Sequence, residues 1–145
     1  MTLPDFAWGA LGAAVSWPIV EFVARPFRQF FDIRRQVNRC LVMYGNVRAR
    51  DSINQKGKRK PNELPTADGA RLTEAENTFR GLAADMRAFA NGEPAANRAV
   101  KLLGYDANKI ASALIGLSSN IGTAGQAKAD AKYEVERLLG IRSVE

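Results

Sequence analysis

Apolar side chains recur every three or four positions along most of this 145-residue chain, and no segment alternates between apolar and polar over a strand's length. Spacings of three and four place side chains on one face of an α-helix. The pattern predicts an all-α protein with an N-terminal apolar helix, a basic amphipathic helix and a small helical bundle. We divide the chain accordingly into an anchor (1–25), a basic helix (26–50), a flexible basic linker (51–66) and a bundle domain (67–145).

The bundle domain is expected to contain four helices joined by tight turns. Four glycine-containing sites mark the expected helix ends, at Asn91-Gly92, Gly104, Gly122 to Gly125 and Gly140. Asp106 is placed to cap the third helix. Thr66 or Asp68 can cap the first, and Thr73 with Glu76 matches a capping box if that helix starts later. Because about 79 residues are near the lower limit for an independent core, support from residues 26–50 or from oligomerisation is expected.

The N-terminal run is the longest uncharged stretch. Residues 6–20 carry no charge, and tolerating Glu21 extends the run to residue 24. As a helix, residues 6–24 would span roughly 28 Å, close to a hydrocarbon thickness of about 30 Å. The run therefore predicts a transmembrane or deeply inserted helix, although Pro18 interrupts it and leaves a buried core helix as an alternative. The anchoring side chains would be Phe6, Trp8, Leu11, Val15, Trp17, Ile19, Val20 and Phe22.

Small residues lie four positions apart within the same run, Gly9 with Ala13 and Ala10 with Ala14. This spacing lets two helix backbones approach closely in a membrane. The pattern favours self-association or packing on a partner helix through these four positions.

Positive charge follows the apolar run directly. The chain has 21 basic and 15 acidic side chains, a net charge of +6. Residues 25–60 hold 11 of the basic groups against only Asp32 and Asp51. Basic residues just after a span favour a cytoplasmic location, so we expect a single-pass protein with its N-terminus outside and its C-terminal domain cytoplasmic. The expected contacts to an anionic surface are Arg25, Arg28, Arg34, Arg35, Arg39, Lys56, Lys58, Arg59 and Lys60.

The basic helix carries one apolar stripe, formed by Phe27, Phe30, Phe31, Val37, Cys40, Leu41, Tyr44 and Val47. Arg34 occupies a position that the stripe would make apolar. Two compatible interpretations follow: an interfacial helix on anionic lipid, or a bundle-core helix with arginines in solvent. Cys40 is expected to be a small buried apolar side chain, with palmitoylation as the alternative.

The composition also excludes several kinds of chemistry. Without histidine the chain cannot form a Ser-His-Asp triad or a histidine metal site, and its single cysteine cannot close an internal disulfide. Residues 115–125 resemble a phosphate-binding loop only loosely, because the GxxxxGK[ST] order is missing. We therefore expect a non-enzymatic protein with no catalytic residues, no cofactor and no metal.

Three functions fit these features. The first is a membrane-anchored helical interaction or structural protein, self-associating or bound to a protein partner, with its bundle against anionic headgroups. The second is a soluble helical oligomer or assembly subunit whose apolar helix is buried between chains. The third is a nucleic-acid-binding adaptor that uses residues 25–60, a partner that the sequence does not favour because no aromatic flanks the Lys56–Lys60 run.

Overall fold

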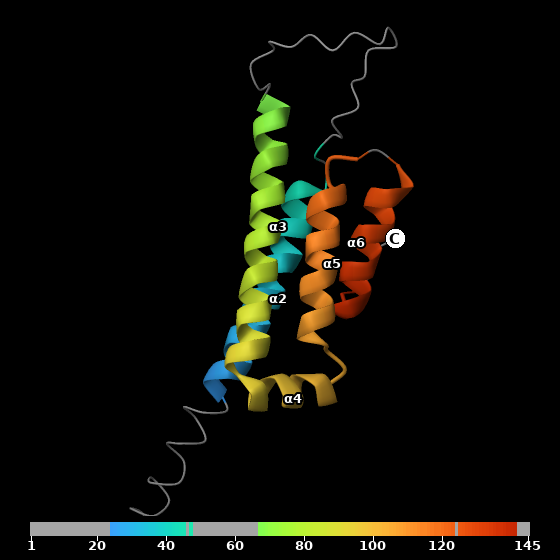
Figure 1. The fold of residues 1–145 in the computed structure, drawn as a ribbon. Helices are drawn as coiled ribbons and strands as arrows, with labels where there is room; N and C mark the ends of the chain where they lie inside the picture. The colour runs from blue at the N-terminus through green and yellow to red at the C-terminus, as the bar shows by residue number, and fades with distance from the viewer. Residues whose placement is uncertain (1–23, 46, 48–66, 124, 142–145) are drawn as a thin grey trace, which may run out of the picture.

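The computed structural model describes residues 24–45, 47, 67–123 and 125–141. Within these residues the protein forms five helices and no strand, which confirms the all-α bundle (Figure 1). The helices are α2 (Arg25–Tyr44), α3 (Ala67–Gly92), α4 (Pro94–Leu102), α5 (Ala107–Asn120) and α6 (Gln126–Leu138). The predicted helix over 6–24, its packing residues Gly9 to Ala14 and the run at Lys56 to Lys60 lie outside the described residues.

Four of the helices stand side by side, and α4 crosses one end of the bundle (Figure 1). The chain runs in alternating directions through α2, α3, α5 and α6, as short connections between neighbouring helices require. α3 is the central helix, since it packs against both α5 and α2, while α6 packs on α5. The end crossed by α4 is also the end at which α2 begins.

The inner face of α2 belongs to the bundle core. Phe30 is completely buried, with ring centroids 5.6 Å from Phe89 and 5.5 Å from Tyr105. Phe27 and Phe31 are half-buried and pack against the same cluster. The apolar stripe is therefore a bundle-core stripe, so these phenylalanines are not free to enter lipid. The expected support of residues 67–145 by this helix is present.

Two details of the predicted stripe were wrong. Ile33, which the predicted stripe left out, is buried, because it lies three positions after Phe30 and four before Val37. The helix ends at Tyr44 rather than continuing toward residue 50, yet Val47 still packs into the core from the turn that follows. The amide of Val47 donates to the carbonyl of Tyr44 at 3.2 Å, which keeps this turn against the helix end.

Glycines end α4 and α6 in the same way, as predicted. Gly104 (φ 92°) and Gly140 (φ 59°) adopt the left-handed conformation that favours glycine. After α6, the amides of Gly140 and Ile141 donate to the carbonyls of Arg137 and Glu136. This is the Schellman motif, and Gly104 with Tyr105 forms the equivalent bonds after α4.

The predictions of helix starts were only partly correct. Asp106 caps α5 as predicted, its carboxylate accepting from the amide of Lys109 at 3.2 Å. The capping box at Thr73 was wrong, because α3 already begins at Ala67 and the Thr73 hydroxyl donates to the carbonyl of Gly69.

The glycine-rich string at 115–125 is a helix end, as expected. Ser118 and Ser119 donate their hydroxyls to the carbonyl of Ile115, and Asn120 donates to the carbonyl of Gly116. These polar groups are thus satisfied by their own helix. Gly122 follows where the chain approaches α3 closely: a Cβ there would lie 3.2 Å from the Leu72 side chain.

Among the described residues, no helix is both long enough and apolar enough to cross a membrane.

Candidate anionic-surface interface

The outer face of α2 carries four arginines. Arg25, Arg28, Arg35 and Arg39 are exposed, on the side opposite the buried Phe30 and Val37. Their spacings of three, seven and four residues keep them on one side of the helix. We call these four residues the arginine face. It brings together four of the six arginines that the sequence predicted to contact an anionic surface; of the other two, Arg34 contacts the end of α6 and Arg59 lies outside the described residues.

Little within the helix neutralises this face. Asp32 is the one acidic residue in α2, and its carboxylate lies 4.0 Å from the Arg35 guanidinium with both side chains largely exposed. An exposed pair at that distance contributes little, about 0–1 kcal/mol. The first turn of α2 has no acidic residue, although the positive end of the helix dipole would favour one. Arg25 and Arg28 therefore lie at the end of α2 where the helix dipole disfavours positive charge.

Arg34, one of the other two predicted arginines, has an internal role. Its Nε donates to the carbonyl of Leu139 at 2.8 Å, and Nη2 reaches the carbonyl of Gly140 at 3.4 Å. Its guanidinium carbon also lies 5.5 Å from the centre of the Tyr105 ring, within range of a cation–π contact. Arg34 thus occupies an apolar-stripe position because it binds carbonyls at the end of α6.

Lys128 makes the reciprocal contact, which the sequence analysis missed. Its Nζ donates to the carbonyl of Val47 at 2.7 Å and reaches that of Gly45 at 3.5 Å, just beyond the end of α2. Partial burial, and secondarily the neighbouring Lys132, lowers the pKa of Lys128. The sequence suggested an ion pair within α6, and only the antiparallel packing of α2 and α6 brings Lys128 to these carbonyls.

Each of these two helices therefore supplies a cation to the carboxyl end of the other. Positive groups are favourable there, because the last carbonyls of a helix lack intrahelical partners and carry partial negative charge. Arg34 and Lys128 together fix the position of α2 along α6. The side of α2 that faces the solvent, and with it the arginine face, is set by the burial of Phe30, Ile33 and Val37 in the core.

The outer face of α3 carries a different charge pattern. Arg71, Arg80 and Arg87 are exposed, but the same helix also carries four acidic residues. One of these, Glu74, accepts a hydrogen bond from the Tyr44 hydroxyl at 3.1 Å and so links α3 to the end of α2. Because α3 carries both positive and negative side chains, it serves as the comparison helix for the arginine face.

The expected ion pairs on α6 are present in part. Arg137 binds Glu134 through two bonds of 2.7 and 2.9 Å, and Lys132 lies 3.5 Å from Glu136. The bond from Arg137 lowers the pKa of Glu134. The Arg137–Glu134 pair is a surface contact, whereas the Glu136 side chain is only 14% exposed.

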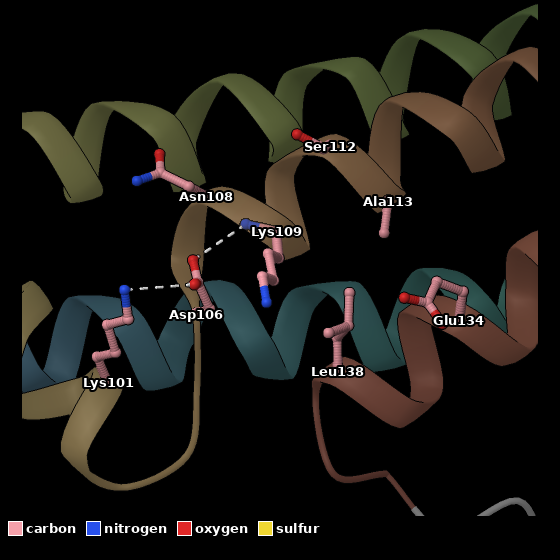
Figure 2. A pocket seen from close by; sticks show the side chains of 8 residues that line it. All are labelled: Lys101, Asp106, Asn108, Lys109, Ser112, Ala113, Glu134 and Leu138. Atoms are coloured by element: carbon pink, nitrogen blue, oxygen red, sulfur yellow. Dashed lines mark hydrogen bonds and ion pairs between the residues drawn. The ribbon is translucent and has the colours of Figure 1, made fainter.

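A shallow hollow of about 470 Å³ lies between α4, α5 and α6 (Figure 2). Three of its charged groups have partners: Lys101 lies 3.7 Å from Asp106, and Glu134 binds Arg137. The remaining lining residues are Asn108, Lys109, Ser112, Ala113 and Leu138. In the described part of the chain, no group of three acidic, cysteine or histidine residues is arranged to hold a metal ion. Nothing in the hollow pairs a nucleophile with a base.

Cys40 is half-buried beside the core, in agreement with the expected small apolar role. Burial raises the pKa of its thiol, and the nearby Arg39 opposes that rise only in part. A thiol with a raised pKa is a poor nucleophile at neutral pH.

Comparisons with protein-family models, curated proteins and solved structures found no match for this chain.

Proposed function

We propose that this is a non-enzymatic, membrane-anchored helical protein whose bundle is held against anionic lipid by the arginine face of α2. Residues 6–24 provide the anchor, through the apolar side chains from Phe6 to Phe22. The bundle lies on the cytoplasmic side, because the arginines follow the anchor. Gly9, Ala10, Ala13 and Ala14 provide the close contact for self-association or for a partner helix.

The observation that carries the proposal is the concentration of exposed positive charge on the arginine face. Four exposed arginines share one side of α2 with a single, weakly paired aspartate. Arg35 and Arg39 are four residues apart, and like charges at this spacing destabilise a helix by about 0.2–0.5 kcal/mol. Charges that cost folding free energy are explained by a partner outside the chain. Next to an anionic lipid surface, each basic group contributes about 1 kcal/mol of binding.

The packing of α2 determines what kind of contact it makes. Phe30, Ile33 and Val37 are buried in the core, so α2 does not insert an apolar face into lipid without unfolding the bundle. The arginine face therefore acts at headgroup level, by charge. Such contacts weaken as salt screens them, with a Debye length of about 8 Å at physiological ionic strength.

Sedimentation of the full chain with vesicles tests this proposal. Vesicles of phosphatidylcholine alone are compared with vesicles that also contain phosphatidylglycerol, at low and at physiological salt. The proposal expects binding to both, with a clear, salt-sensitive preference for the anionic vesicles. Equal binding to both would overturn the role of the arginine face. A monodisperse multimer that ignores vesicles would favour the soluble assembly, and salt-sensitive retention on DNA or RNA without vesicle binding would favour the nucleic-acid adaptor.

A further inference from the structure

The outer face of α4 exposes two leucines at one end of the bundle. Ala96 and Val100 of this helix are buried, whereas Leu102 is 89% exposed and Leu103 is 58% exposed. Leucines that lie so far out of the core cost free energy in water, about 25 cal/mol for each Å² of apolar surface. Leu102 is the last residue of α4 and Leu103 follows it directly, so the two form a small apolar projection at the end of this helix.

Positive charge surrounds this projection. Arg98 and Lys101 are exposed on α4, and the helix contains no acidic residue. Arg98 precedes Leu102 by four positions, so the two share the side of α4 opposite Ala96 and Val100. Lys101 lies 3.7 Å from Asp106, but its side chain remains 69% exposed. Exposed leucines flanked by basic groups are typical of a surface that rests on anionic lipid.

The location of α4 points to the same partner. The helix crosses the end of the bundle at which α2 begins (Figure 1). Phe30 and Phe31 of α2 contact Tyr105, two residues beyond Leu103, so this end of α2 and the end of α4 are packed together. The chain that precedes Arg25 therefore joins the bundle at the end covered by α4. In the function proposed above, that preceding chain is the membrane anchor.

We propose that the outer face of α4, formed by Arg98, Lys101, Leu102 and Leu103, is a second contact with the anionic lipid surface. The leucines enter the interfacial region, and the two basic side chains lie at the headgroups. This inference rests on the proposed function and adds an orientation: the bundle tilts onto the end where α2 starts and α4 crosses. Val42 and Met43, exposed near the opposite end of α2, then stay away from the lipid.

The chain offers a matched control for the test. L102Q/L103Q removes the leucines of α4, while V42Q/M43Q removes an equally adjacent exposed pair at the far end of α2. Both pairs are exposed, so both variants should unfold thermally as the unmodified chain does. With anionic vesicles, we expect L102Q/L103Q to weaken binding of the full chain at least about tenfold, a loss of about 1.4 kcal/mol. V42Q/M43Q should change binding by less than about twofold.

Other results would overturn this inference. If L102Q/L103Q binds as the unmodified chain does while anionic lipid is still preferred, the α4 contact fails and the proposed function stands. If the unmodified chain has no anionic preference, the proposed function itself fails. If V42Q/M43Q loses more vesicle binding than L102Q/L103Q does, the opposite end of the bundle faces the lipid. If L102Q/L103Q converts a dimer into a monomer in lipid-free buffer, measured by light scattering, the leucines bind a second copy instead.

Discussion

The helices α2 and α3 bury the same kind of inner face but differ in their outer faces. Phe30 of α2 and Phe79 of α3 are both essentially inaccessible, and both belong to one core cluster. The exposed side of α2 has four arginines and one aspartate, while the sequence of α3 as a whole contains three arginines and four acidic residues. Core packing constrains only the inner stripe, so it does not account for the difference in charge. We attribute that difference to the partner that we propose for α2, an anionic lipid surface, which α3 does not contact.

The first prediction tests whether α2 is as integral to the core as α3. Phe30→Ala and Phe79→Ala should each lower the free energy of unfolding by about 3–5 kcal/mol, because each leaves a cavity among buried side chains. Urea unfolding followed by circular dichroism measures both. If Phe30→Ala alone lowers the free energy of unfolding by less than about 1 kcal/mol, α2 is only loosely attached to the bundle. The two helices would then not be equivalent parts of the core.

The second prediction separates Arg34 from the arginine face. Arg34→Gln should lower the free energy of unfolding by about 1–3 kcal/mol, because it removes a charged donor from the carbonyls of Leu139 and Gly140. Arg35→Gln, its exposed neighbour, should change the free energy of unfolding by less than about 0.5 kcal/mol. The same urea titrations apply, and equal effects for the two variants would contradict the internal role of Arg34.

The third prediction concerns the reciprocal contact at the other end of the α2–α6 pair. Lys128→Met should cost about 1 kcal/mol, since the carbonyl of Val47 loses its charged donor. Lys132→Met removes a lysine that is 44% exposed and lies 3.5 Å from Glu136, and it should cost less than Lys128→Met. If thermal melting ranks Lys132→Met as the more damaging variant, Lys128 does not fix α2 against α6.

The fourth and smallest effect compares two surface pairs. The pKa of Glu134 is lowered by Arg137, so this pair stabilises the fold above the ordinary glutamate pKa of about 4.3 and is lost as pH falls through the lowered value. With Glu134→Gln or with Arg137→Gln, the free energy of unfolding should therefore fall less steeply as the pH is lowered into the acidic range. Asp32→Asn on α2 should leave stability at neutral pH unchanged, because its contact with Arg35 is long and exposed. A clear destabilisation by Asp32→Asn would mean that the arginine face is neutralised within the helix.

Helix ends and apolar stripes could be predicted from the sequence because they depend on local chemistry. Gly104 and Gly140 end their helices because the left-handed conformation suits glycine, and Asp106 caps α5 through an amide three residues away. The buried face of α2 followed equally from its periodicity, apart from Ile33. In each case the interacting residues lie within one or two helical turns.

The roles of Arg34 and Lys128 could not be predicted, because their partners lie far away in the sequence. Arg34 reaches residues 105 and 106 positions later, and Lys128 reaches carbonyls 81 and 83 positions earlier. Sequence reasoning grouped Arg34 with the surface arginines because charge alone does not distinguish a solvent-facing guanidinium from one that binds a helix end. One signal pointed to the difference: Arg34 occupies the stripe, where an exposed arginine is out of place.

The most direct test of the account compares two charge-matched variants of the full chain on anionic vesicles. R28Q/R35Q/R39Q removes three charges from α2, and R71Q/R80Q/R87Q removes three from α3. At about 1 kcal/mol per group near the surface, the α2 variant should lose between about tenfold and a hundredfold in binding. The α3 variant should lose less than about threefold. Equal losses of vesicle binding in the two variants would contradict the account, because net charge rather than the arginine face would then control binding. Unchanged vesicle binding by the α2 variant would also contradict it.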